Sequence, residues 1–173
     1  MITTVKMKQF TTFWTDTSIA ELPSLSPVYH SSYNSQRDMV LKFGPVVTGY
    51  YNDLMKKENI TVSDTTHSPY FDSNLYPAII RWLPLKEGYS SSMAIYDYNP
   101  RGKTGVLKAT IQSVSKDSIM MPKTGKQPVW VVKVADEIAE GSLSTYYIHE
   151  LTRRLLKQEI KIPGRMMIME LEE

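Results

Sequence analysis

Three histidines, His30, His67 and His149, are the first residues of this chain that could bind a metal or move a proton. Histidines that share a metal usually lie about three to five residues apart, as in H-E-x-x-H, whereas these three are far from one another in the chain. A metal site would therefore need contacts made by the fold. Because turn or surface histidines titrating near neutral pH are the simpler interpretation, we predict neither a metal nor a cofactor.

Serines and carboxylates are the second set of candidates. The sequence has no Gly-x-Ser-x-Gly turn, and residues 90–92, all serine, have no histidine nearby in the chain. Catalytic groups are often assembled by the fold, so an enzyme would need at least two His and Asp side chains to converge in one cleft. We expect these acids to cap helices, fill turns or lie at the surface, and we predict that the protein is not an enzyme. The His and Asp set comprises His30, His67, His149, Asp72, Asp97 and Asp136.

The segment Gly102-Lys103-Thr104 is similar to the end of a phosphate-binding loop. The first glycine of that motif would have to stand at position 97, which is Asp97. The segment also precedes a strand-like run, whereas a phosphate-binding loop leads into a helix whose N-terminal amides face the anion. We interpret it as a turn.

Aromatic residues are numerous, with 11 tyrosines and 3 tryptophans, and several fall in strand-like runs. They could line a pocket for a lipid or another apolar small molecule, or they could form the cross-strand pairs of an ordinary β core. The 10 methionines allow the same two interpretations, because flexible thioethers suit both cores and adaptable surfaces. For the pocket we predict five lining residues: Ile79, Trp82, Tyr96, Tyr98 and Trp130.

Composition limits the partners. The 20 basic and 18 acidic residues leave a net charge of +2, so no concentrated field attracts nucleic acid, and we expect no nucleic-acid partner. No apolar run is long enough to cross a bilayer, and we predict no transmembrane segment. The chain has no cysteine, so packing alone has to stabilise it. Its 173 residues suggest one β-rich domain spanning residues 1–173.

The elements that position these side chains are mainly strands. Short runs with a period of two are separated by Gly, Pro, Asn and Asp, which is typical of half-buried strands joined by turns. In residues 37–43, Met39 and Leu41 alternate with polar neighbours. Residues 129–132 are apolar throughout and predict a central strand covered on both faces. The expected strands are 5–14, 37–43, 46–51, 59–63, 90–98, 104–114, 129–135, 145–148, 155–162 and 166–171.

Residues 70–83 are the exception, because their apolar residues recur at spacings of three and four and favour a helix. Residue 72 or 73, Asp or Ser, can cap it. Pro77 is tolerated only in the first turn, so the helix should begin near Tyr76 and stop before Pro84. The helix is apolar nearly all round, which predicts that other structure encloses it. We therefore expect a mainly β fold, in which a curved antiparallel sheet or half-barrel wraps around one apolar helix.

Four segments carry a family resemblance: YHSSYN at 29–34, YFDSNLYP at 70–77, RWLPL at 81–85 and RRLLKQE at 153–159. Together they resemble an exported bacterial family catalogued as domain of unknown function 3108, over most of the chain from Asp16 onward. That family is similar, more distantly, to periplasmic carriers and outer-membrane receptors of lipoproteins, which curve an antiparallel sheet around helices and hold acyl chains in the hollow. Its members commonly have a glycine where this chain has Arg153.

The resemblance implies a protein of the periplasm or cell envelope, of which this chain would be the mature or C-terminal part, and it supplies no catalytic residues. The leading hypothesis is a non-enzymatic exported protein that holds a lipid or other apolar ligand between sheet and helix. A fully packed space there would contradict it. The alternative is a structural or protein-interaction module that recruits an envelope partner through an exposed sheet edge, and a long uncovered edge would favour it. The third hypothesis is an enzyme with a tertiary cluster from the His and Asp set.

Overall fold

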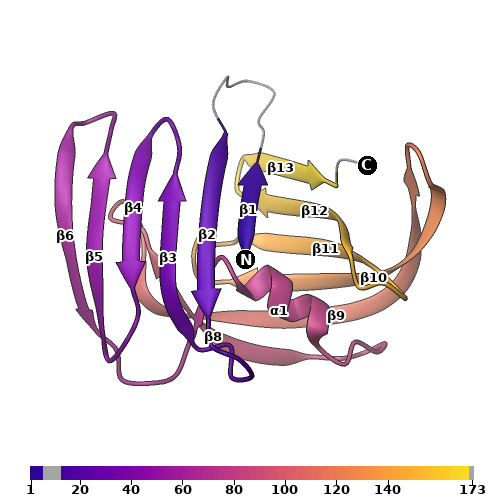
Figure 1. The fold of residues 1–173 in the computed structure, drawn as a ribbon. Helices are drawn as coiled ribbons and strands as arrows, with labels where there is room; N and C mark the ends of the chain where they lie inside the picture. Colours follow the sequence, from indigo (N-terminus) through magenta and orange to yellow (C-terminus); the bar gives the residue numbers. More distant parts are fainter. Residues whose placement is uncertain (6–12, 172–173) are drawn as a thin grey trace. The chain divides into compact units, whose positions relative to one another are not determined.

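The computed structural model describes residues 1–5 and 13–171, and within them the chain consists of thirteen β-strands and one short α-helix (Figure 1). The prediction of a mainly β fold is confirmed. The strands form two antiparallel sheets, neither closed into a barrel, in place of the one sheet that we expected. The chain divides into two compact units, Met1–Tyr76 and Pro77–Glu173.

The first unit is a meander of six strands in which each strand pairs with the next. The predicted alternation in residues 37–43 is confirmed, because Met39 and Leu41 are buried. Gly49 faces Leu41 across the ladder, and a Cβ there would clash with the backbone of the neighbouring strand, which explains the glycine. Most of the predicted strand 5–14 lies outside the described residues. The strands are β1 (Ile2–Val5), β2 (Trp14–Ala20), β3 (Pro27–Tyr33), β4 (Arg37–Lys42), β5 (Val46–Asp53) and β6 (Glu58–Thr65), and the two-residue β7 (Phe71–Asp72) follows them.

The second unit is an antiparallel meander of six longer strands. One of them, β10, lies between β9 and β11, and all four residues from Val129 to Val132 are buried, so the prediction of a covered interior strand is confirmed. The strand β9 runs to Met121, past the predicted end at Val114, because its polar residues 115–118 pair with β10. Such pairing leaves no signal in the periodicity of one strand. The strands are β8 (Ser91–Tyr98), β9 (Thr104–Met121), β10 (Gly125–Asp136), β11 (Leu143–His149), β12 (Leu155–Ile162) and β13 (Arg165–Glu170).

The helix α1 (Tyr76–Trp82) begins at the predicted residue and ends before Pro84, as predicted. Ile79 and Ile80 are buried, as an apolar helix requires. The expectation that other structure encloses the helix on all sides is wrong at its last residue, because Trp82 is 60% exposed. The described residues contain no helix that is long and apolar enough to cross a bilayer.

The turn between β11 and β12 contains a non-glycine residue in the left-handed conformation. Arg153 has a φ of 58°. Its N–H donates to the carbonyl of His149 at 3.0 Å, and its own carbonyl accepts a hydrogen bond from Nε of Arg81 at 2.5 Å. The turn is therefore tied to the last residues of α1, and these hydrogen bonds hold Arg153 in a conformation that glycine would adopt without strain.

Candidate functional site

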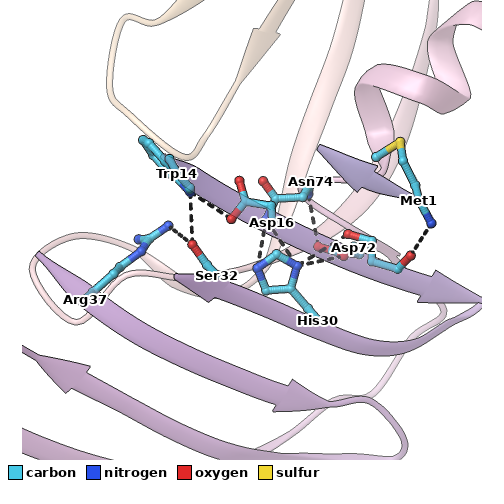
Figure 2. A network of polar contacts seen from close by, with 9 residues as sticks. Met1, Trp14, Asp16, His30, Ser32, Arg37, Asp72 and Asn74 are labelled. Carbon is cyan, nitrogen blue, oxygen red and sulfur yellow. Dashed lines mark hydrogen bonds and ion pairs between the residues drawn. The ribbon is translucent and has the colours of Figure 1, made fainter. Parts of the chain in front are cut away.

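The fold brings together two members of the His and Asp set. Nδ1 of His30, in β3, lies 3.2 Å from Oδ2 of Asp72, in β7 (Figure 2). His30 is 1% exposed and Asp72 is 2% exposed, so the pair is buried. Ser18 of β2 and Asn74 also contact the ring of His30. We call these four residues the His30 cluster.

Asp72 reaches His30 because its two carboxylate oxygens bind different partners. Oδ1 accepts the backbone N–H of Asn74 at 3.0 Å, and the Asp72 carbonyl accepts the N–H of Leu75 at 2.9 Å. Both bonds shape the turn that leads into α1. Oδ2 is thereby directed at His30. The Asp72 carboxylate therefore shapes the turn before α1 but binds no N–H of the helix itself, so the prediction that Asp72 caps the helix is wrong.

The His30 ring has polar neighbours at both nitrogens. Oδ2 of Asp72 lies 3.2 Å from Nδ1, and Nδ2 of Asn74 lies 3.0 Å from Nε2. The same Nδ2 lies 3.3 Å from Nδ1, and Oγ of Ser18 lies 3.4 Å from Nδ1. Both ring nitrogens therefore have partners within the cluster, as a buried imidazole requires.

The His30 cluster differs from a catalytic triad in two respects. In a triad the serine and the carboxylate bind opposite nitrogens of the imidazole, so that the ring can pass a proton between them. Here Ser18 and Asp72 both approach Nδ1. Ser18, His30 and Asp72 are also each at most 2% exposed, so these three side chains offer no surface to a substrate. What the arrangement can do is hold the segment 72–74 against β2 and β3.

The other members of the His and Asp set lie in turns and at strand ends. His67 is exposed, and Asp97 is half-buried close to the end of β8. Nδ1 of His149 accepts two backbone N–H groups of its own turn, at 3.2 and 3.1 Å. Oδ1 of Asp136 accepts a backbone N–H and a serine hydroxyl of its own turn. Across residues 1–5 and 13–171, no group of three or more His, Cys, Asp or Glu side chains could hold a metal ion.

A second polar group lies beside the His30 cluster on the same face of the first sheet. Nε1 of Trp14 donates to Oδ1 of Asp16 at 2.8 Å and to Oγ of Ser32 at 3.1 Å (Figure 2). Nη2 of Arg37 also donates to Ser32, at 3.1 Å, and the guanidinium lies 5.3 Å from the centre of the Trp14 ring. Sequence reasoning did not identify this group, because only the register that sets Ser32 opposite Asp16 brings it together.

The residues predicted to line an apolar pocket do not share one face of the second sheet. Tyr96 and Tyr98 alternate with Ile95 and so point to the opposite face from it. Following the register from β8 through β9 to β10 places Trp130 on the face of Ile95. Trp130 and the two tyrosines therefore lie on different faces. Tyr96 is 1% and Trp130 is 7% exposed, which agrees with the alternative that aromatic residues fill the core.

Two shallow depressions lie on the described part of the chain, and none of the five predicted ligand residues lines either of them. One, of about 350 Å³, lies over β8 and β9 beside Glu137. The other, of about 370 Å³, lies beside Pro27, His67 and Tyr70. Both are open to solvent, so neither resembles the enclosed hollow that an acyl chain would occupy.

The strand β13 presents apolar side chains at an edge of the second sheet. Among the described residues it pairs with β12 alone. Met166 is 58% and Ile168 is 51% exposed, and the two alternate along one face of the strand. The strand contains no proline and no lysine, residues that discourage further pairing. Sequence reasoning predicted a strand here, but the exposure of its edge depends on strand order, which periodicity does not give.

The fold and these clusters define a mainly β protein with two open antiparallel sheets, a buried polar cluster and an exposed apolar edge strand. The family model described as "Protein of unknown function (DUF3108)" matches residues 1–170, and the chain belongs to this family. The family resemblance seen in the sequence is thereby confirmed, whereas the more distant similarity to lipoprotein carriers stays a prediction. A search of the curated proteins and a search of the solved structures gave no match.

Proposed function

We propose that this protein is a non-enzymatic interaction module of the periplasm or cell envelope, which binds an extended segment of a partner along β13. The observation that carries the proposal is the edge position of β13, with Met166 and Ile168 both more than half exposed. A partner strand would add its backbone hydrogen bonds to this edge and pack its own side chains on these two residues. The placement in the envelope is supported by the family resemblance alone.

The last strand of the first sheet gives a useful contrast. Among the described residues β6 also pairs with one neighbour, β5. Its exposed residues are polar or acidic: Glu58, Asn59, Thr61, Ser63 and Thr65. Polar and charged side chains protect a sheet edge from unwanted pairing, and β13 has four consecutive apolar residues in their place. Of these two edges, β13 is the one whose chemistry favours pairing.

Covering β13 with a partner strand should contribute a measurable part of the binding free energy. Full burial of a Met or Ile side chain contributes roughly 1.5–3 kcal/mol relative to leaving it exposed. Because Met166 and Ile168 are already about half covered, a partner strand should recover roughly half of that amount for each of them.

The test uses a peptide of the sequence LLKQEIKI, residues 155–162, with blocked ends, because this strand already pairs antiparallel with β13 in the fold. Amide exchange followed by NMR should slow at Met166, Ile168 and Glu170 when the peptide is added. The same peptide with proline in place of its central glutamate lacks one backbone donor and should bind more weakly.

Two protein variants complete the test. Ile168→Lys should abolish the effect, since it puts a charge on the edge. Met120→Lys is the matched control, because Met120 is 74% exposed but lies near the β9–β10 turn, and this variant should bind normally. Unchanged exchange at all three β13 amides at millimolar peptide would reject the proposal.

Binding of a lipid or other apolar ligand between sheet and helix is the second candidate, and the exposed Trp82 favours it. A tryptophan 60% exposed at the end of an apolar helix offers a contact for an apolar molecule. Native mass spectrometry of the purified protein, followed by denaturing extraction, tests this candidate. A stoichiometric lipid would support it, whereas a clean apo mass with no stabilisation by added lipid would count against it.

A further inference from the structure

We infer that the strand bound by β13 is the β13 of a second copy of this chain, so that two second sheets join into one continuous sheet with twofold symmetry. This inference rests on the proposed function of the β13 edge and names its partner. It comes from three features of the strand: which backbone groups point outward, which side chains are exposed, and where the charges lie.

The outward backbone groups of β13 follow from its pairing with β12. The N–H of Leu171 donates to the carbonyl of Leu156, so Leu171 points toward β12. Backbone groups alternate in direction along an antiparallel strand. Arg165, Met167 and Met169 therefore bond to β12, whereas the even-numbered residues of β13 direct N–H and C=O away from it. Met166, Ile168 and Glu170 are those residues, and they form an edge that no other described strand pairs with.

Twofold symmetry restricts the register. Residues directly opposite each other in a sheet have side chains on the same face, so a symmetric antiparallel pair must be centred on one residue that faces its own copy. Centring on Met167 sets Met166 of each copy opposite Ile168 of the other copy. Both are exposed by more than half in the single chain, and the outward backbone groups of the two residues then face each other.

The competing arrangements are less favourable. Centring on Ile168 sets Met166 opposite Glu170 of the second copy, which packs an apolar side chain against a carboxylate. A parallel arrangement brings Arg165 next to Arg165 and Glu170 next to Glu170. The antiparallel pair centred on Met167 instead sets Arg165 opposite Met169 of the second copy, so like charges do not face each other across the pair.

The absence of cysteine from the chain allows a direct test of the register. Met167→Cys introduces a single thiol, and in the proposed dimer the two thiols face each other at a pair without backbone hydrogen bonds, close enough for a disulfide. Mild oxidation should link Met167→Cys at least roughly tenfold faster than Leu151→Cys, whose thiol would stand at an 83% exposed turn position away from the edge. Light scattering of the unmodified chain should show a mass that falls from dimer to monomer on dilution.

Four results separate the outcomes. Adding Ile168→Lys to Met167→Cys should reduce linking to the rate of Leu151→Cys, and faster linking of Ile168→Cys than of Met167→Cys would overturn the register. If Met167→Cys links no faster than Leu151→Cys while the 155–162 peptide still protects the β13 amides, the second copy is the wrong partner and the edge function stands. If neither linking nor peptide protection occurs, the edge function fails as well.

Discussion

On the first sheet, buried His30 and Ser18 are in hydrogen-bonding contact with each other and His30 contacts Asp72 of β7, whereas in the second sheet Met121, Val129, Val131 and Leu156 pack as an apolar cluster. The two arrangements should respond to mutation differently. A buried polar group needs specific partners, and losing one leaves another unsatisfied. An apolar cluster needs volume, and it tolerates a change of shape better than a loss of atoms.

The largest effect is expected at Asp72. Asp72→Ala removes the partner of His30 Nδ1 and the acceptor of the Asn74 N–H at once. We expect it to lower the free energy of unfolding by about 4 kcal/mol, measured by urea denaturation, because a buried pair is broken and the turn loses the acceptor of the Asn74 N–H. Asp117→Ala, at an exposed acid of β9, is the control and should change it by less than about 0.5 kcal/mol. An Asp72→Ala protein as stable as the control would mean that the polar cluster contributes nothing to the fold.

The apolar cluster should show the opposite tolerance. Leu156 is 6% exposed, and Leu156→Ala should cost about 3 kcal/mol through lost burial and the cavity left behind. Met121→Leu keeps nearly the same volume and should cost less than about 1.5 kcal/mol. Asp72→Asn, the equivalent isosteric change in the polar cluster, should cost more than Met121→Leu. If Asp72→Asn and Met121→Leu lower the free energy of unfolding equally, the two clusters do not differ in their tolerance of isosteric changes.

The indole nitrogens of Trp14 and Trp130 allow a closer comparison of the two sheets. Nε1 of Trp14 has two acceptors, whereas Nε1 of Trp130 is buried without a hydrogen-bond partner among the described residues. Both rings also have a cation over them, Arg37 and Lys116, so Trp→Phe removes a similar contact at each. Trp14→Phe should therefore cost about 1 kcal/mol more than Trp130→Phe in thermal or urea unfolding, from the lost hydrogen bonds. The reverse order would show that packing of the indole outweighs its N–H.

Two left-handed residues allow a comparison of turns. Arg153 in the second unit and Lys57 in the first both have a φ of 58°. Glycine relieves the strain of this conformation and costs some unfolded-chain entropy, so Arg153→Gly and Lys57→Gly should each stabilise by about 0.5–1 kcal/mol. Arg153→Ala keeps the strain and should give no gain. Destabilisation by Arg153→Gly alone would show that the Arg153 side chain, not only its carbonyl, supports the tie to Arg81.

Sequence periodicity predicted the local elements of the fold because the two faces of each strand differ in polarity. Residues 155–162 form a strand with the predicted bounds, and the helix starts at Tyr76 as its proline spacing requires. The division into two sheets and the extension of β9 to Met121 were not predictable from this pattern. Both depend on which strands pair, and pairing is decided by contacts between residues distant in the chain.

The residues of the candidate site were likewise predictable only in part. His30 and Asp72 could be named from their chemistry, but no pattern in the sequence indicated that they would contact each other. Ser18 and Asn74 carried no signal at all, since a serine in an alternating strand and an asparagine in a turn are both ordinary. The exposed edge of β13 could not be found either, because exposure follows from strand order.

The smallest effect is expected from the ion pair at the border of the apolar cluster. Nζ of Lys157 lies 2.8 Å from Oε1 of Glu159, whose other oxygen accepts the hydroxyl of Tyr147 at 3.1 Å. The hydrogen bond from Lys157 lowers the pKa of Glu159 below its ordinary 4.5, and the hydrogen bond to Glu159 raises the pKa of Lys157 above its ordinary 10.5. Both charged groups are about one-quarter exposed, so solvent screening keeps the contribution below about 1 kcal/mol.

The sign of the pH dependence follows from these two shifts. The contribution of Glu159 is present above pH 4.5 and is lost as the pH falls through its lowered pKa. The contribution of Lys157 is present below pH 10.5 and is lost as the pH rises through its raised pKa. Glu159→Gln should therefore flatten the acid limb of the urea midpoint plotted against pH, and about 0.5 M salt should flatten it partly in the unmodified protein. If Glu159→Gln leaves the acid limb unchanged, carboxylates elsewhere in the chain determine the loss of stability at low pH.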